Sequence, residues 1–156
     1  MTDNMTAEMD GQQMDMAMAA GEKAAGYFGE GYHCAEAVVA AFFEHLGDDP
    51  TEAVAHATPF GGGFGKTFGD ACGVLSGCMI AIGHVCGRRK KGENWDLPAE
   101  FGAAVRQQFI DRHGTSNCSL LRQRFGEEQQ MAECRNLVRQ GTIALLQMYR
   151  DRNSGT

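Results

Sequence analysis

The sequence predicts an all-α fold, a single-domain bundle of about five to seven helices with a glycine-rich loop before the central helix. Helical apolar spacing fills the segments between glycine, proline and Asx signals, and no stretch shows convincing period-two alternation of polar and apolar residues. The 156 residues are 43% hydrophobic and 22% charged, enough for one core without a stabilising metal or disulfide. We expect the domain over residues 20–150, between a flexible methionine-rich segment (1–19) and a flexible tail (151–156).

Turn residues bound the expected helices of the first half. An alanine-rich helix over 17–28 is expected to stop at two closely spaced glycines, and a second helix over 34–46 to end at Gly47 as its C-terminal cap. Asp49 and Pro50 are typical of the N-cap and first position of a short helix that runs to about residue 57. A long loop rich in glycine follows, at positions 61, 62, 63, 65 and 69.

Turn and cap residues also bound the expected helices of the second half. A helix of small residues over 71–86 is closed by Gly87. Asp96 and Pro98 start a helix over 96–113, and Asn117 caps a short turn that begins at Cys118. A last helix over 127–150 carries one apolar stripe, formed by Met131, Cys134, Val138, Gly141, Leu145 and Met148.

Charge and the N-terminal composition narrow the class of protein. Fourteen Lys and Arg against 20 Asp and Glu give a net charge of −6, which argues against nucleic-acid binding. The first eight residues lack a secretory signal, and the most apolar window, 71–87, is too short to cross a bilayer. We therefore expect a cytoplasmic protein without membrane insertion, where cysteines are more often metal ligands or redox-active thiols than structural disulfides.

Helix rise divides the six cysteines into two groups. Cys72, Cys78 and Cys86 share one expected helix, and a rise of about 1.5 Å per residue separates them by roughly 9 and 12 Å. Thiolates on one zinc ion lie only about 3.8 Å apart, so these three cannot share an ion or pair with one another. At most one of them can join the remaining cysteines, which are on separate segments.

The place of each cysteine within its expected helix indicates which of the three joins the site. Cys34, Cys72 and Cys118 each fall in the first turn of an expected helix, where free N–H groups favour a thiolate. Cys78 and Cys86 lie deeper, among apolar neighbours, and are interpreted as small buried hydrophobes. The candidate site is therefore Cys34, Cys72, Cys118 and Cys134, although spacing alone leaves scattered core thiols equally open.

The chain resembles the redox-active proteins named for the pattern C_GCAxxG_C_C, which carry four characteristic cysteines. The resemblance covers about residues 20–150, and the family's cysteines map onto the same four positions. Two departures are Val74 in place of the motif alanine and His33 in place of the usual asparagine. The matching blocks are His33-Cys34-Ala35-Glu36-Ala37-Val38, Phe60-Gly61-Gly62-Gly63, Cys72-Gly73-Val74-Leu75-Ser76-Gly77, Arg112-His113-Gly114, Asn117-Cys118-Ser119-Leu120-Leu121 and Cys134-Arg135-Asn136-Leu137-Val138.

The resemblance implies a redox role, and two mechanisms fit it. The four cysteines would ligate an iron–sulfur cluster or other metal centre for electron transfer, which we favour, or two of them would cycle between dithiol and disulfide. Structural zinc is less expected because the sequence has no closely spaced pairs of ligands. The sequence also lacks the C-x-x-C-H motif that attaches haem c, so no haem c is expected. The backbone glycines expected to approach such a site closely are Gly61, Gly62, Gly63 and Gly73.

Other signals are interpreted as structural. Residues 61–67 resemble a phosphate-binding loop, but Phe60 occupies the first glycine position and no strand precedes it, so no nucleotide is expected. Residues 1–19 hold six of the nine methionines, which could bind Cu(I), although a frayed tail or a helix start is favoured. His33 could tune the Cys34 thiolate or replace a ligand.

The sequence identifies no redox partner. It leaves open an oxidoreductase, an electron-transfer protein, or a non-catalytic, metal-stabilised accessory module of an oxidoreductase or transporter. A small-residue face on the helix expected over 71–86 predicts close helix packing, with a homodimer as the alternative.

Overall fold

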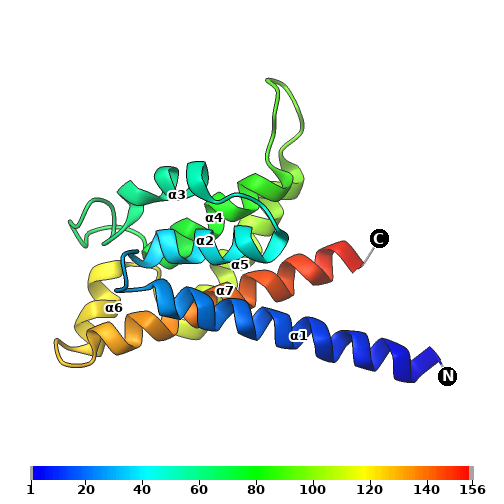
Figure 1. Ribbon diagram of the computed structural model, residues 1–156. Helices are drawn as coiled ribbons and strands as arrows, with labels where there is room; N and C mark the ends of the chain where they lie inside the picture. The colour runs from blue at the N-terminus through cyan, green and yellow to red at the C-terminus, as the bar shows by residue number, and fades with distance from the viewer. Residues whose placement is uncertain (1, 155–156) are drawn as a thin grey trace.

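The computed structural model describes residues 2–154, and it confirms the all-α fold. Within that range there are seven α-helices, one short 3₁₀ helix and no β-strand. Figure 1 shows the helices packed into one bundle. Their bounds are α1 Thr2–Tyr27, α2 Cys34–Leu46, α3 Thr51–Ala57, η1 Thr58–Phe60, α4 Gly73–Cys86, α5 Asp96–His113, α6 Cys118–Phe125 and α7 Gln130–Ser154.

Helix α2 is the buried centre of the bundle. It packs against α1, α3, α4 and α7, and its run of small and aromatic residues from Ala35 to Phe43 is buried except for Glu36. Small side chains let the neighbouring helices approach it closely. The ring of Phe42, fully buried, meets Tyr149 of α7 edge-on at 5.8 Å between ring centroids. This core fixes the position of the N-terminus of α2, where Cys34 lies.

Helices α1 and α7 lie side by side and run in opposite directions (Figure 1). Gly21 of α1 makes this contact possible, because a β-carbon there would lie 2.5 Å from Cγ1 of Ile143 and 3.0 Å from the carbonyl oxygen of Arg139. An ion pair between Arg139 and Glu22, at 2.7 Å, spans the same pair of helices. In Figure 1 the N-terminal end of α1 projects past the rest of the bundle.

Three helices differ in their bounds from the expected ones. Helix α1 begins at Thr2 rather than at residue 17, so most of the methionine-rich segment is helical; its Met5 and Met9 are exposed. Helix α4 begins at Gly73, which makes Cys72 its N-cap. Helix α7 begins at Gln130 and continues through the expected tail to Ser154, while residues 1, 155 and 156 lie outside the described residues.

The caps of α2, α5 and α6 are as predicted. Gly47 and Gly114 close α2 and α5 in the left-handed conformation, with φ of 78° and 79°. Asn117 caps α6, and its side chain accepts from the amide of Leu120. At α3 the cap is shifted by one residue from the expected position. Pro50, not Asp49, is the N-cap residue, although the Asp49 carboxylate still accepts from the amide of Thr51.

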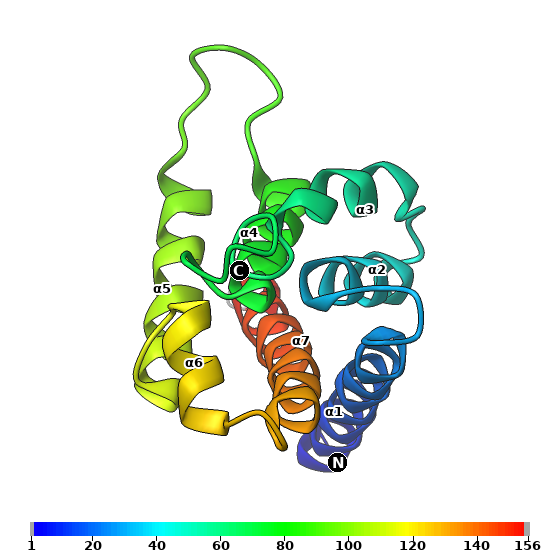
Figure 2. The same cartoon turned by 90° about the vertical axis from the view of Figure 1, so that its left-hand side faces the viewer.

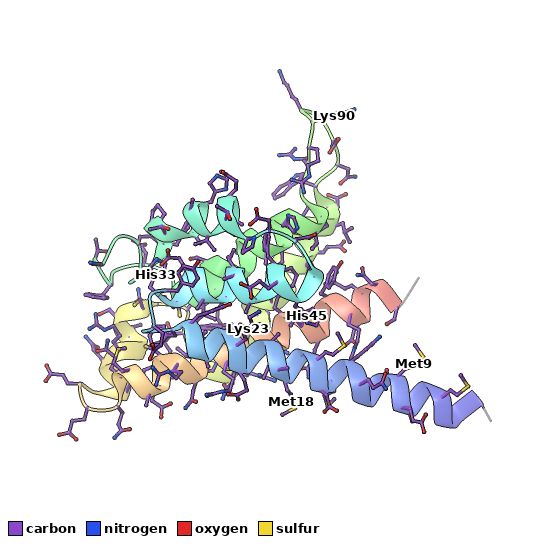
Figure 3. All side chains as sticks on the ribbon, viewed as in Figure 1. Met9, Met18, Lys23, His33, His45 and Lys90 are labelled. Atoms are coloured by element: carbon purple, nitrogen blue, oxygen red, sulfur yellow. The ribbon has the colours of Figure 1, made fainter. Side chains whose placement is uncertain are left out.

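A basic loop joins α4 to α5. Residues 87–95 rise away from the bundle in Figure 2, and Figure 3 shows Lys90 at the tip. The guanidinium of Arg88 lies 5.9 Å from the ring centroid of Trp95. None of the helices in residues 2–154 combines the length and apolar character needed to span a bilayer.

Candidate functional site

The four candidate cysteines line one cavity of about 480 Å³. Each comes from a different segment: Cys34 is the first residue of α2, Cys72 caps α4, Cys118 is the first residue of α6, and Cys134 lies in the first turns of α7. These helix starts gather at the end of the bundle that also carries the glycine-rich loop (Figures 1 and 2). The structure thus brings together the set that helix geometry selected, with three of the four at or beside a helix N-terminus.

Cys34 lies in a nest of hydrogen-bond donors. Its sulfur interacts with the backbone amides of Gly62 and Ala35 and with the side chain of His33. Burial favours the neutral thiol, yet these donors hold the pKa of Cys34 below its ordinary value. Cys34 is therefore the thiol of this site that most readily becomes a thiolate.

His33 is fixed beside Cys34 by the N-terminus of α2. It is the N-cap residue, and its backbone amide donates to the carboxylate of Glu36 at 3.2 Å. Its Nε2 donates to the carbonyl oxygen of Thr58 at 2.8 Å. Burial opposes the charged ring, but contact with the Cys34 sulfur and these oxygens raises the pKa of His33 above its ordinary value.

Two glycines permit the close approach of backbone to this pair. A β-carbon on Gly73 would overlap the sulfur of Cys34, and one on Gly61 would lie 2.5 Å from the ring of His33. Contacts this short do not occur in folded proteins, so any side chain at either position would displace the neighbouring group. The glycines thus mould the wall of the cavity around Cys34 and His33.

The glycine-rich loop forms a left-handed turn. Five consecutive residues from Gly62 to Lys66 have φ between 59° and 69°, including the non-glycine residues Phe64 and Lys66. Such a conformation costs roughly 1–2 kcal/mol for each residue with a β-carbon. A β-carbon on Gly63 would lie 2.7 Å from Cβ of Cys118. Of the four glycines expected near the cysteines, Gly61, Gly62 and Gly73 line the cavity, and Gly63 lies against Cys118.

The left-handed turn also distinguishes this glycine-rich loop from a phosphate-binding loop. In a phosphate-binding loop the Lys-Thr pair opens a helix, whose free N–H groups face the phosphates. Here Lys66 ends the left-handed turn, and α4 begins only at Gly73. The hydroxyl of Thr67 donates to the carbonyl oxygen of Gly63 at 2.8 Å.

A short backbone pairing holds Cys72 and Cys118 in register. The amide of Cys72 donates to the carbonyl of Ser116 at 2.7 Å, and the amide of Cys118 donates to the carbonyl of Asp70 at 2.8 Å. The side chain of Asn117 adds a bond to the carbonyl of Gly69 at 3.0 Å. The two chain segments, remote in sequence, are thereby locked together at the cavity.

The other three thiols resist ionisation. Burial is the main reason that the pKa of Cys72 lies far above its ordinary value, with the charge of Cys34 adding to it. The same two causes raise the pKa of Cys134, to about 11, and that of Cys118. A positive centre among the four sulfurs would reverse this repulsion, because a cation stabilises thiolates.

Neither Cys78 nor Cys86, which the sequence analysis interprets as packing residues, is among the residues that line the cavity. Cys78 is buried in the core with 2% exposure, and burial raises its pKa to about 12. Cys86 is partly exposed near the end of α4, and its thiol donates to the carbonyl of Ile82 at 3.3 Å.

Among the lining residues that the sequence did not predict as site residues are Lys66, Phe68, Arg122 and Gln130. The guanidinium of Arg122 lies 3.5 Å from the ring centroid of Phe68 and donates to Gln130 at 3.0 Å. Its Nε is buried and has no hydrogen-bond partner among the described residues. The four-residue step from Cys118 to Arg122 could have signalled that both lie on one face of α6.

The sulfurs surround the cavity rather than meet at a point. Within residues 2–154, no three His, Cys, Asp or Glu side chains are placed to hold one metal ion. The donors instead enclose a volume, together with backbone N–H groups and two cations. The arrangement suits a ligand that is larger than one ion.

The sequence profile of a family described as "Putative redox-active protein (C_GCAxxG_C_C)" matches residues 32–148, which include all four cysteines of the cavity. The chain belongs to this family. The resemblance carried by the six motif blocks is thus confirmed. Neither a curated protein nor a solved structure matches the chain.

The two departures from the C_GCAxxG_C_C pattern have structural counterparts. The side chain of Val74, at the motif alanine, lies against Gly141 of α7, where a β-carbon would overlap its Cγ1. The larger residue on α4 is thus matched by the absence of a side chain on α7. His33, in the usual asparagine position, still caps α2 and adds an imidazole beside Cys34.

Proposed function

We propose that this protein is an electron-transfer protein whose four-cysteine cavity binds an iron–sulfur cluster. The observation that carries the proposal is that Cys34, Cys72, Cys118 and Cys134, from four separate segments, line one cavity of about 480 Å³. Four thiolate ligands are the usual set for such clusters. A dithiol would need two sulfurs in direct contact and no enclosed volume.

The polar groups of the cavity fit an anionic sulfur centre. Backbone amides of Gly62 and Ala35 are directed at the Cys34 sulfur, the kind of hydrogen bond that stabilises ligand thiolates. Lys66 and Arg122 line the cavity, and the buried Nε of Arg122 lacks a partner among the described residues. An anion in the cavity would give that N–H an acceptor.

A cluster is favoured over a single zinc ion by the spread of the donors. Sulfurs on one zinc lie about 3.8 Å apart, and the described residues contain no such convergent set. When bound, a cluster supplies one-electron transfer at a potential set by its surroundings. Phe28, Phe68 and Leu137 supply apolar wall that would limit the access of water to it.

Dithiol chemistry is the second candidate, and the ionisation of Cys34 is the observation that favours it. Its pKa is lowered while those of the other three cavity cysteines are raised. Such asymmetry suits one attacking thiolate and a resolving thiol of higher pKa. The step would form a bond between Cys34 and a second cavity sulfur, delivering two electrons and two protons to a disulfide substrate.

All six cysteines are free thiols in the structure. We propose a cytoplasmic setting, because glutathione and thioredoxin keep thiols reduced there.

Purification under anaerobic conditions tests these candidates. A brown protein with sulfur-to-iron charge-transfer absorption, lost when Cys34 is replaced by serine, would support the cluster. Colourless protein with one zinc per chain would favour a metal-stabilised accessory module. Colourless, metal-free protein that loses two thiols on mild oxidation would favour the dithiol mechanism.

A further inference from the structure

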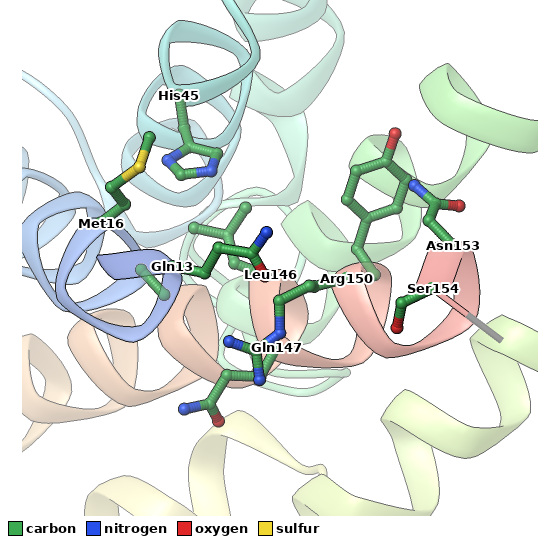
Figure 4. Close-up of a pocket in the computed structure, with 10 residues that line it drawn as sticks. Gln13, Met16, His45, Leu146, Gln147, Arg150, Asn153 and Ser154 are labelled. Atoms are coloured by element: carbon green, nitrogen blue, oxygen red, sulfur yellow. The ribbon is translucent and has the colours of Figure 1, made fainter. Parts of the chain in front are cut away.

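A second cavity, of about 460 Å³, lies at the opposite end of α2 from the cysteines. It is enclosed by α1, the last turn of α2 and the C-terminal half of α7 (Figure 4). His45, on its wall, follows Cys34 by eleven residues, which places the two about 16 Å apart along the helix. The two cavities are therefore separate sites.

Arg150 gives this cavity an unsatisfied cation. Its Nη1 is buried and has no hydrogen-bond partner among the described residues. Among the described residues, Nε and Nη2 of Arg150 contact only the Asp151 carboxylate, at 3.5 Å, the outer limit of a useful hydrogen bond. A buried N–H without a partner is destabilising, and an anionic acceptor would remove that cost.

His45 is a second polar group on the wall of this cavity. Neither of its ring nitrogens has a hydrogen bond within the described residues, and burial lowers its pKa. It is therefore neutral near pH 7 and keeps one N–H to donate. Figure 4 shows His45 and Arg150 around the same hollow, with the amides of Gln13 and Gln147 beside them.

None of the described residues that line this cavity is acidic. Polar side chains able to donate hydrogen bonds, among them Gln13, His45, Gln147 and Arg150, thus line a space to which the described residues contribute no carboxylate. Apolar atoms complete the wall, from Met16 and Ala17 of α1 and from Leu146 and Tyr149 of α7. A ligand that suits both the hydrogen-bond donors and the apolar wall has an anionic group at one end and a short hydrocarbon chain.

We propose that this cavity binds a small organic carboxylate. The carboxylate accepts from Arg150 and His45, and the hydrocarbon part packs against Met16 and Leu146. The guanidinium fork matches two carboxylate oxygens, which makes a monocarboxylate a better fit than a neutral polar molecule. The site needs none of the cavity cysteines, so its test is independent of the redox proposal.

Calorimetric titration of the full chain with hexanoate tests the proposal, with hexanamide as the neutral probe and inorganic phosphate as the bare anion. Arg150→Gln removes the proposed anchor. Arg152→Gln is the matched control, because it removes the same charge from the same turn of α7 but its guanidinium lies over Phe101 instead, 4.7 Å from the ring centroid. Circular dichroism verifies that both variants remain helical.

We expect saturable binding of hexanoate, at least tenfold weaker binding to Arg150→Gln, and unchanged binding to Arg152→Gln. Absence of saturable hexanoate binding, equal binding of hexanamide, or equal losses in the two variants would each overturn the proposal. Binding of phosphate in preference to hexanoate would also overturn it, since the apolar wall would then have no role. Should Arg150→Gln unfold, the comparison of hexanoate with hexanamide on the unaltered chain decides.

Discussion

The α-carbon of Gly73 lies against the sulfur of Cys34, so closely that a β-carbon would overlap it. Gly73 opens α4 directly after Cys72, whereas Cys34 opens α2. The contact therefore fixes the distance between the starts of two helices that each carry a cavity cysteine. A residue without a side chain is required here by geometry, independently of backbone conformation.

Gly73→Ala should disrupt the cavity. The methyl group must push the Cys34 sulfur from its hydrogen bonds or separate α2 from α4, and overpacking of this kind costs about 1–3 kcal/mol. We expect the loss of bound iron together with a lower thermal midpoint, measured by metal analysis and circular dichroism.

The control for this change is Gly83→Ala on the same helix, where a β-carbon would meet nothing within 4 Å. Alanine is a better helix former by up to about 1 kcal/mol, so this variant should be as stable as the unaltered protein or more so. If both alanines cost the same, the contact between Gly73 and Cys34 does not matter.

Gly63→Ala should damage the site more than Gly65→Ala. Both positions have positive φ, so both variants strain the left-handed turn. Only at Gly63 does a β-carbon also meet Cβ of Cys118, at 2.7 Å; at Gly65 nothing lies within 4 Å. We expect both variants to be destabilised but only Gly63→Ala to lose the centre, as visible absorption would record. Equal absorption in the two variants would contradict the described loop.

Serine substitutions should separate the cavity cysteines from the others. Cys72→Ser removes a proposed ligand and should abolish the centre, measured as iron per chain. Cys78→Ser buries a hydroxyl in the core and should lower stability, whereas Cys86→Ser should do little; both should keep the iron. Iron loss in Cys78→Ser, if the protein remains folded, would mean that the site is wrongly assigned.

The pH dependence of alkylation should single out Cys34 in metal-free, reduced protein. Because its pKa is lowered, its thiolate is populated at a lower pH than that of a free cysteine, and its alkylation rate should rise first. Cys134, with a pKa raised to about 11, should follow only in strongly alkaline solution.

Mass spectrometry of iodoacetamide-treated peptides measures this order. His33→Ala should shift the Cys34 profile to higher pH, because a group that stabilises the thiolate is removed. A profile of Cys34 that coincides with that of Cys134 would refute the proposed nest.

The fold follows from local signals to a large extent. Gly47 and Gly114 adopt the left-handed cap conformation that their positions predict, and Asn117 accepts the predicted hydrogen bond. The length of α1 was missed, because the polar, methionine-rich residues before 17 carry no apolar stripe. Residues 7–16 are all exposed, so no core pattern marks them as helical.

The site was predictable in its cysteines and not in its remaining wall. Helix rise shows that at most one of Cys72, Cys78 and Cys86 can join the site, and the place of Cys72 in the first turn of its expected helix then selects it. Lys66 and Phe68 reach the cavity because the loop before α4 forms a left-handed turn. That turn includes two residues with a β-carbon, and such residues disfavour the left-handed conformation. Only the packing of Gly61 and Gly63 against His33 and Cys118 shows why that turn is formed.

Iron and acid-labile sulfide analysis of anaerobically prepared protein tests the central claim most directly. We predict iron and sulfide in equal amounts, several of each per chain, and the loss of both on replacement of any one cavity cysteine. A fully reduced, folded protein that holds neither iron nor sulfide, even after supply of both, would contradict it.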